Sequence, residues 1–185
     1  MTTGSLGQGI SCAVGIALGS KIKKDNAYIY SIIGDGESQE GQVWEAMMFA
    51  ASKKLDNLIA FLDLNRFQID GAVEEVNGID PFDLKASSFN WNVVVCKDGN
   101  DIEAIDAAIC KAKASDKPTL IMIHTIIGYG SKHQGTSKVH GAPLGEEDGA
   151  YAKKAYGYEY PSWVVPEEVS KDFANSFIAR GEKAY

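Results

Sequence analysis

The sequence is poor in cysteine and contains no close cysteine pair. Its three cysteines are Cys12, Cys96 and Cys110, and each lies among apolar residues. An odd number without close pairs disfavours both a disulfide framework and a zinc site, so we expect small buried apolar side chains instead. The sequence also lacks a signal peptide and any apolar run long enough to cross a membrane. We therefore expect a cytoplasmic protein with no membrane partner.

Basic residues are outnumbered by acidic ones. The chain has 18 Lys and Arg residues against 25 Asp and Glu residues, which gives a formal net charge of −7. Nucleic-acid binding needs clustered basic residues, so this balance disfavours nucleic acid as the main partner. A composition of 45% hydrophobic and 23% charged residues over 185 positions favours a folded domain with a sizeable core. A local anion site stays open, because backbone N–H groups and a metal ion can build one.

Apolar runs alternate with amphipathic segments along most of the chain. We expect strands at residues 28–33, 58–64, 91–96 and 119–125, and helices near residues 10–24, 42–54, 79–89 and 102–114. This alternation predicts an α/β fold with a mostly parallel sheet and helices on both of its faces. Such a domain would cover residues 1–150, followed by a connector and helix over residues 151–185. His124, inside an apolar strand, is expected to be a core histidine.

One acidic residue lies between two glycines where a strand gives way to a helix. Asp35 follows the strand at residues 28–33, and open parallel sheets bind ligands at such carboxyl ends. Asn65 ends the next strand and would share this edge if the two strands are neighbours, although an Asn here is also a common turn residue. A carboxylate and an amide oxygen suit Mg²⁺ when phosphates supply further oxygens. The residues alone predict a site for a metal ion and a phosphorylated cofactor.

Two glycine-rich segments flank this region in the sequence. Residues 2–9 lead into the first helix, and a turn of this kind is an anion site in principle, although many such turns are purely structural. No Gly-Lys-Ser/Thr follows, so the segment is not a P-loop. The segment from Ile126 to Gly149 contains His133 and His140 and predicts a binding loop. His140 could equally be a polar surface residue, and Glu40 could serve only as a favourable charge near a helix start.

Four motifs in this order resemble the thiamine diphosphate-binding domain of transketolase, especially its split bacterial and archaeal forms. They are Thr-Thr-Gly-Ser-Leu-Gly-Gln-Gly at 2–9, Gly-Asp-Gly-Glu-Ser-Gln-Glu-Gly at 34–41, Ile-Asp-Gly at 69–71 and His-Gly-Ala-Pro-Leu-Gly at 140–145. The resemblance covers nearly the whole chain. It implies the diphosphate-binding (PP-type) version of the thiamine diphosphate fold. It also implies transfer of a two-carbon ketol unit between sugar phosphates of the pentose phosphate pathway, with thiamine diphosphate and Mg²⁺ or Ca²⁺.

The resemblance also implies roles for individual residues. The metal ion would be held by Asp35, Asn65 and the backbone carbonyl of Phe67, where family members often have Ile. The cofactor would contact Gly4, Ser5, Leu6, Gly36, Asn65 and His140, with Ser5 standing where the family usually has Pro. The catalytic residues would be His140, at the diphosphate and the substrate, and Glu40, which matches the acidic residue that links the two cofactor sites across the family's dimer interface.

The chain departs from the family pattern at both ends. It begins at the Thr-Thr-Gly motif, without the preceding segment that carries further histidines, and it lacks the second domain that binds the aminopyrimidine. We therefore expect an N-terminally truncated subunit that needs a C-terminal transketolase subunit or domain, in a homodimer or heterotetramer, and that exposes one sheet edge or face. Two alternatives stay open. One is a dihydroxyacetone synthase or deoxyxylulose-phosphate synthase, the latter disfavoured by residues 140–145. The other is a non-catalytic binding or assembly module.

Overall fold

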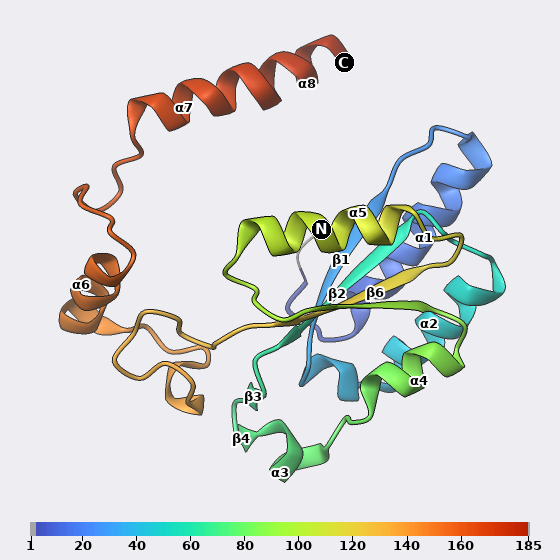
Figure 1. Cartoon of the computed structure of the whole chain (residues 1–185), viewed down its shortest axis with the longest axis horizontal. Helices are drawn as coiled ribbons and strands as arrows, with labels where there is room; N and C mark the ends of the chain where they lie inside the picture. The colour runs from blue at the N-terminus through green and yellow to red at the C-terminus, as the bar shows by residue number, and fades with distance from the viewer. Residues whose placement is uncertain (1–2, 185) are drawn as a thin grey trace. The chain divides into compact units, whose positions relative to one another are not determined.

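The structure is a computed structural model that describes residues 3–184 (Figure 1). Thr2 of the first glycine-rich motif and Tyr185 at the end of the last expected helix lie outside the described residues. The chain divides into two compact units, one formed by residues 1–129 and 133–143 and the other by residues 130–132 and 144–185. Each unit is described by itself. The functional boundary that we expect at residue 150 stays a prediction.

The larger unit is built on a parallel sheet of four strands in the order β1-β2-β6-β5. The strands are β1 (Ile29–Gly34), β2 (Leu58–Leu64), β5 (Asn92–Cys96) and β6 (Thr119–His124). Each neighbouring pair is parallel, and Asp63 lies opposite both Gly34 of β1 and Ile123 of β6. Continuous apolar runs form these strands because a parallel sheet is covered on both faces. The expected parallel α/β fold is confirmed, and the carboxyl ends of β1, β2 and β6 meet at one edge.

Helices cover both faces of this sheet. One face carries α1 (Gln8–Lys23), α2 (Gly41–Ser52) and α4 (Phe82–Ser88), and the other carries α5 (Ile102–Lys113) (Figure 1). The first buried cluster includes Val14, Met47 and Phe82 from these helices and Ile33 and Leu62 from the strands. The second joins Ala108 and Ala112 of α5 to Ile59 and Ile121. Alternate residues of β2 therefore enter opposite clusters, as the two-residue period of a strand requires.

A small hairpin follows the end of β2 and lies below the sheet edge in Figure 1. It consists of β3 (Phe67–Gln68) and β4 (Gly71–Ala72), which pair in antiparallel fashion, and it leads into α3 (Val73–Asn77). Two single turns of 3₁₀-helix, η1 (Glu37–Gln39) and η2 (Ser137–Val139), occur in the loops after β1 and β6. The chain thus places short, tightly turned segments after three neighbouring strand ends.

Part of the sheet is left uncovered at its β1 edge. Tyr30 and Ile32 point away from the α1 side and are 45% and 75% exposed, whereas Ile33, on the face that α1 and α2 cover, is fully buried. The α5 cluster draws on β2, β5 and β6, and none of its members in the described part of the chain comes from β1. The exposed sheet edge that the sequence predicted is present.

The smaller unit contains α6 (Gly145–Ala155), α7 (Glu167–Phe173), the π-helical turn η3 (Ala174–Ile178) and α8 (Ala179–Ala184). Asp148 is buried and accepts hydrogen bonds from Ser131 Oγ at 2.6 Å and from the Lys132 backbone N–H at 2.8 Å. This carboxylate fixes residues 130–132 to α6. Between residues 3 and 184, no helix has the length and apolar character needed to cross a membrane.

Two expectations about buried residues are wrong. His124 is exposed, because it is the last residue of β6 and lies beyond the residues that α5 covers. Cys110 is exposed and Cys12 is half-buried, so only Cys96 behaves as the expected core cysteine. The buried positions of α5 are 108 and 112, and residue 110 lies on the opposite side of that helix.

Candidate functional site

Asp35 is a buried carboxylate at the end of β1. It is 1% exposed, and its two oxygens accept backbone hydrogen bonds, Oδ1 from Gly36 at 2.8 Å and Oδ2 from Arg66 at 2.6 Å. Burial raises the pKa of Asp35, and the nearby Asp63 acts in the same direction, while the two backbone hydrogen bonds and, more weakly, the charge of Arg66 oppose them. The ion pairs found between residues 3 and 184 do not include Asp35. Its charge is therefore not compensated by a bound basic side chain.

Asn65 is the first residue after β2 and forms a tight turn with the next two residues. Its Oδ1 accepts the backbone N–H of Phe67 at 2.9 Å, and its Nδ2 donates to Asp63 Oδ2 at 3.2 Å. Arg66, in the middle of the turn, has a φ of 68° in the left-handed region. The backbone N–H of Arg66 thus donates to Asp35, and the next one, of Phe67, donates to Asn65. The structure brings together the carboxylate and the amide that the sequence placed on one sheet edge.

The oxygen atoms at this turn fit a hard divalent cation. Within the described residues 3–184, there is no group of three or more His, Cys, Asp or Glu side chains that could hold a metal ion, so an all-protein cage is absent there. One carboxylate, one amide oxygen and the Phe67 carbonyl leave positions that a ligand's phosphates and water can fill, as Mg²⁺ prefers. A buried carboxylate without a cation is costly, and a metal ion would remove that cost. The role of this group of residues stays a prediction.

The Glu37 carboxylate connects the first glycine-rich loop to the end of β1 through two hydrogen bonds. Its Oε1 accepts the backbone N–H of Gly7 at 2.8 Å, and its Oε2 accepts that of Gly34 at 3.1 Å. Gln42 Nε2 also donates to the carbonyl of Leu6 at 3.1 Å. The loop residues predicted to contact the cofactor, Gly4, Ser5 and Leu6, are exposed. Sequence reasoning did not identify Glu37 or Gln42, although Glu37 lies inside the Gly-Asp-Gly-Glu motif that it quoted.

Gly36 lies directly against the hairpin that follows β2. A Cβ added at Gly36 would lie 3.2 Å from the Cβ of Gln68, so a larger residue would press on that side chain. Gln68 Oε1 accepts from Gln39 Nε2 at 2.8 Å, and the same Nε2 donates to the carbonyl of Asn77 at 2.7 Å. The Gly-Asp-Gly turn and the β3–β4 hairpin are therefore held together by side-chain amides.

The two residues predicted to be catalytic lie outside this hydrogen-bonded group. Glu40 is exposed at the start of α2, and its Cβ would be 3.1 Å from a Cβ added at Gly7, which places it beside the first glycine-rich loop. His140 is exposed in the loop after β6, where its backbone N–H donates to the carbonyl of Ser137 at 3.0 Å. Within the described chain, its side chain makes no hydrogen bond or ion pair. The structure does not join His140 to Asp35 by a contact.

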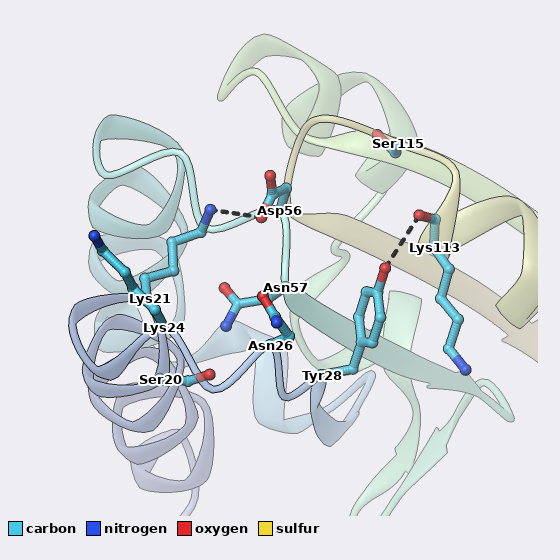
Figure 2. A pocket seen from close by; sticks show the side chains of 9 residues that line it. All are labelled: Ser20, Lys21, Lys24, Asn26, Tyr28, Asp56, Asn57, Lys113 and Ser115. Atoms are coloured by element: carbon cyan, nitrogen blue, oxygen red, sulfur yellow. Dashed lines mark hydrogen bonds and ion pairs between the residues drawn. The ribbon is translucent and has the colours of Figure 1, made fainter.

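A cavity of about 580 Å³ lies at the other, amino end of the strands (Figure 2). Figure 2 shows Lys21 paired with Asp56, at 2.7 Å, and the Tyr28 hydroxyl donating to the carbonyl of Lys113. The cavity also receives the carboxyl ends of α1 and α5, at Lys24 and Lys113, whose partial negative charge offsets the lysines. Because it is at the opposite end of the strands from Asp35, this cavity is not part of the candidate site.

Comparison with known proteins covers the full chain. The family model for the transketolase thiamine diphosphate binding domain matches residues 1–185. A transketolase from Streptococcus pyogenes is 44% identical over 199 residues, which cover 99% of this chain and 26% of that protein. The 6-deoxy-6-sulfo-D-fructose transketolase subunit SqwG from a Clostridium species is 48% identical over 149 residues, which cover 80% of this chain and 54% of that subunit.

Solved structures agree with this match. A transketolase from Pichia stipitis, solved in complex with sedoheptulose 7-phosphate, is 40% identical with a TM-score of 0.90, over 99% of this chain and 29% of that chain. The expected PP-type thiamine diphosphate-binding fold is thereby confirmed. The chain spans between about a quarter and about half of the length of these relatives. With its whole length matched, the chain belongs to the transketolase family, in which it corresponds to the thiamine diphosphate binding domain.

Proposed function

We propose that this chain is the diphosphate-binding half of a transketolase, and that Asp35, Asn65 and the Phe67 carbonyl hold the divalent ion that anchors thiamine diphosphate. The observation that carries this proposal is the contact at 2.6 Å between Asp35 Oδ2 and the N–H of Arg66, in the turn that also presents Asn65. A nearly inaccessible carboxylate that forms no ion pair between residues 3 and 184 supports a cation at this point. Mg²⁺ fits the donor set, and Ca²⁺ is the alternative.

The loops around this turn have the features that diphosphate binding needs. Gly4, Ser5 and Leu6 offer exposed backbone beside the strand ends, and Gly36 removes a side chain where the backbone turns. When bound, thiamine diphosphate supplies the electron sink for moving a two-carbon ketol unit between sugar phosphates. His140 is free of side-chain partners within the described chain, so it can bind the diphosphate or move a proton at the substrate. Glu40 would link this cofactor site to the second cofactor site across a dimer interface.

The proposed reaction needs a pyrimidine-binding domain or subunit. The relative from Clostridium is named a transketolase subunit, and this chain covers 54% of it, which supports a division of the enzyme between chains. We expect the assembly to be a homodimer or a heterotetramer. The cytoplasmic location stays a prediction in the same way.

Calorimetry with thiamine diphosphate and Mg²⁺, with and without a pyrimidine-domain subunit, tests this function. We expect metal-dependent binding, and ketol transfer only when the partner is present. Asp35→Ala should abolish the metal-dependent part, while Asp116→Asn, an exposed substitution in the turn before β6, should not. Metal-dependent binding without transfer in any mixture would instead favour a non-catalytic binding module. Wild-type affinity in Asp35→Ala would reject the site.

A further inference from the structure

The carboxylate of Asp63 connects the amide of Asn65 to the end of β6. Its Oδ2 accepts from Asn65 Nδ2 at 3.2 Å, and its Oδ1 accepts from the hydroxyl of Thr125. The contact is possible because β2 and β6 are parallel neighbours, with Leu64 opposite His124, so the residues that follow in each strand meet at the same edge. The backbone N–H of Thr125 also donates to the carbonyl of Leu64. Asp63 is half-buried, and both of its oxygens are engaged.

These contacts allow only one orientation of the Asn65 amide. In the observed orientation, Nδ2 faces the Asp63 carboxylate and Oδ1 faces the N–H of Phe67. Rotating the amide by half a turn would put two acceptors together at Asp63 and two donors together at Phe67. Both hydrogen bonds would then be lost, and each half-buried group would be left unpaired. The oxygen of Asn65 is therefore fixed towards the N–H of Phe67, next to the Arg66 N–H that donates to Asp35.

We propose that Asp63 is a positioning residue, held by Thr125, that orients Asn65 so that its amide oxygen is available to the divalent ion. This inference rests on the proposed function, since it assigns no ligand of its own to the metal. Asp63 acts through Asn65, because one of its oxygens accepts from the Asn65 amide itself and the other accepts from Thr125. Partners that orient metal ligands in this way are worth roughly 10–100-fold in metal affinity when they are removed.

Three substitutions separate orientation from charge and from folding. Asp63→Ala removes both acceptors and leaves the Asn65 amide free to rotate. Asp63→Asn keeps one acceptor for Asn65, and the Thr125 hydroxyl can turn to accept from the new amide, so orientation survives while the charge is lost. Thr125→Val removes one hydrogen bond to Asp63 at nearly constant volume. Asp116→Asn, exposed and without a contact to the site, is the matched control for loss of a carboxylate.

The first measurement is the affinity for Mn²⁺. It is determined by electron paramagnetic resonance on the full chain with saturating thiamine diphosphate. We expect Asp63→Ala to weaken Mn²⁺ binding by about 10–100-fold, with smaller losses in Asp63→Asn and Thr125→Val and none in Asp116→Asn. The second measurement is the NMR signal pair of the Asn65 side-chain amide without metal. We expect the pair to shift and broaden in Asp63→Ala but to keep its wild-type position in the control.

The outcomes distinguish this inference from the function on which it rests. If wild type binds Mn²⁺ and Asp35→Ala does not, the metal site stands. Wild-type affinity and an unchanged Asn65 amide signal in Asp63→Ala would then overturn the positioning role alone. If Asp63→Ala does not fold, a loss in Thr125→Val without a fall in its melting temperature supports the role, and no loss rejects it. Absence of metal-dependent binding in wild type, with or without the partner subunit, overturns both proposals.

Discussion

Glu37 accepts the backbone N–H of Gly7 at 2.8 Å, although 30 positions separate the two residues in the sequence. Its second oxygen accepts the N–H of Gly34 at 3.1 Å, so one carboxylate joins the loop before α1 to the end of β1. The loop that would contact the cofactor is thus joined to the end of β1 by the Glu37 side chain, while Gln42 holds it from α2. The hydrogen bonds of Glu37 therefore contribute both to the stability of the fold and to the position of the proposed cofactor-binding loop.

Replacing Glu37 should therefore affect both stability and cofactor affinity. Glu37→Ala leaves the N–H groups of Gly7 and Gly34 without their acceptor, which costs about 1–3 kcal/mol for each buried group that water does not reach. We expect a lower free energy of unfolding in urea and weaker binding of thiamine diphosphate with Mg²⁺. Glu45→Ala, on the exposed side of α2, is the control and should change neither. Weaker binding in the control as well would contradict this role of Glu37.

Two glycines of the same region should respond oppositely to alanine. Gly7 has a φ of 79°, and a Cβ added there would lie 2.9 Å from the Cγ of Gln42, so Gly7→Ala is strained and crowded. We expect it to destabilise the chain by about 1–3 kcal/mol. Gly15 lies inside α1 with open space around it, and Gly15→Ala should stabilise by about 0.5–1 kcal/mol through helix propensity. Thermal melts of both variants measure the difference, and equal shifts would be inconsistent with it.

The raised pKa of Asp35 predicts an unusual pH dependence. The unfolded chain gives this group its ordinary pKa near 3.8, and burial raises the pKa in the folded chain. Between the two values the folded state holds more protons, so the stability contribution of Asp35 falls as pH rises through this window. The difference in unfolding free energy between wild type and Asp35→Ala, measured across acidic pH, should show this fall. Saturating Mg²⁺ and thiamine diphosphate should reverse it, because the ion favours the charged form.

The sequence predicted the parts of the fold that depend on local patterns. Continuous apolar runs located all four strands of the sheet, and the amphipathic pattern over residues 102–114 located α5. The helix α6 was not predicted, because Gly145 and Gly149 interrupt its pattern while Asp148, buried against Ser131, stabilises its first turn. Tertiary contacts therefore stabilise α6, which local helix propensity does not predict.

The candidate site was predictable only in part for the same reason. Asp35 and Asn65 each follow a strand, so their neighbourhood followed from the expected parallel pairing of the strands. The contacts that hold them depend on a left-handed Arg66 and on the side chains of Asp63, in β2, and Thr125, directly after β6. No local pattern reports contacts of this kind. The role of His140 came only from the resemblance to transketolase, and no contact in the described chain tests it.

His140→Ala should lower turnover without lowering stability. The side chain is exposed and makes no hydrogen bond within the described residues, so removing it leaves no unpaired group. We expect ketol transfer with a partner subunit to fall by about 100-fold or more, in line with the usual share of a proton-transferring side chain. His124→Ala, also exposed, is the matched control. A melting temperature that falls in step with activity would point to a structural role.

Two adjacent isoleucines of β1 should differ sharply, because they lie on opposite faces of the sheet. Ile33 is fully buried in the cluster with α1 and α2, and Ile33→Ala should cost about 2–5 kcal/mol in unfolding free energy. Ile32 is 75% exposed at the uncovered edge, so Ile32→Ala should leave stability nearly unchanged while reducing self-association of the isolated chain in light scattering. Similar losses of stability in both variants would mean that the face bearing Ile32 is covered in solution. Equal self-association of Ile32→Ala and wild type would mean that the chain does not self-associate through this edge.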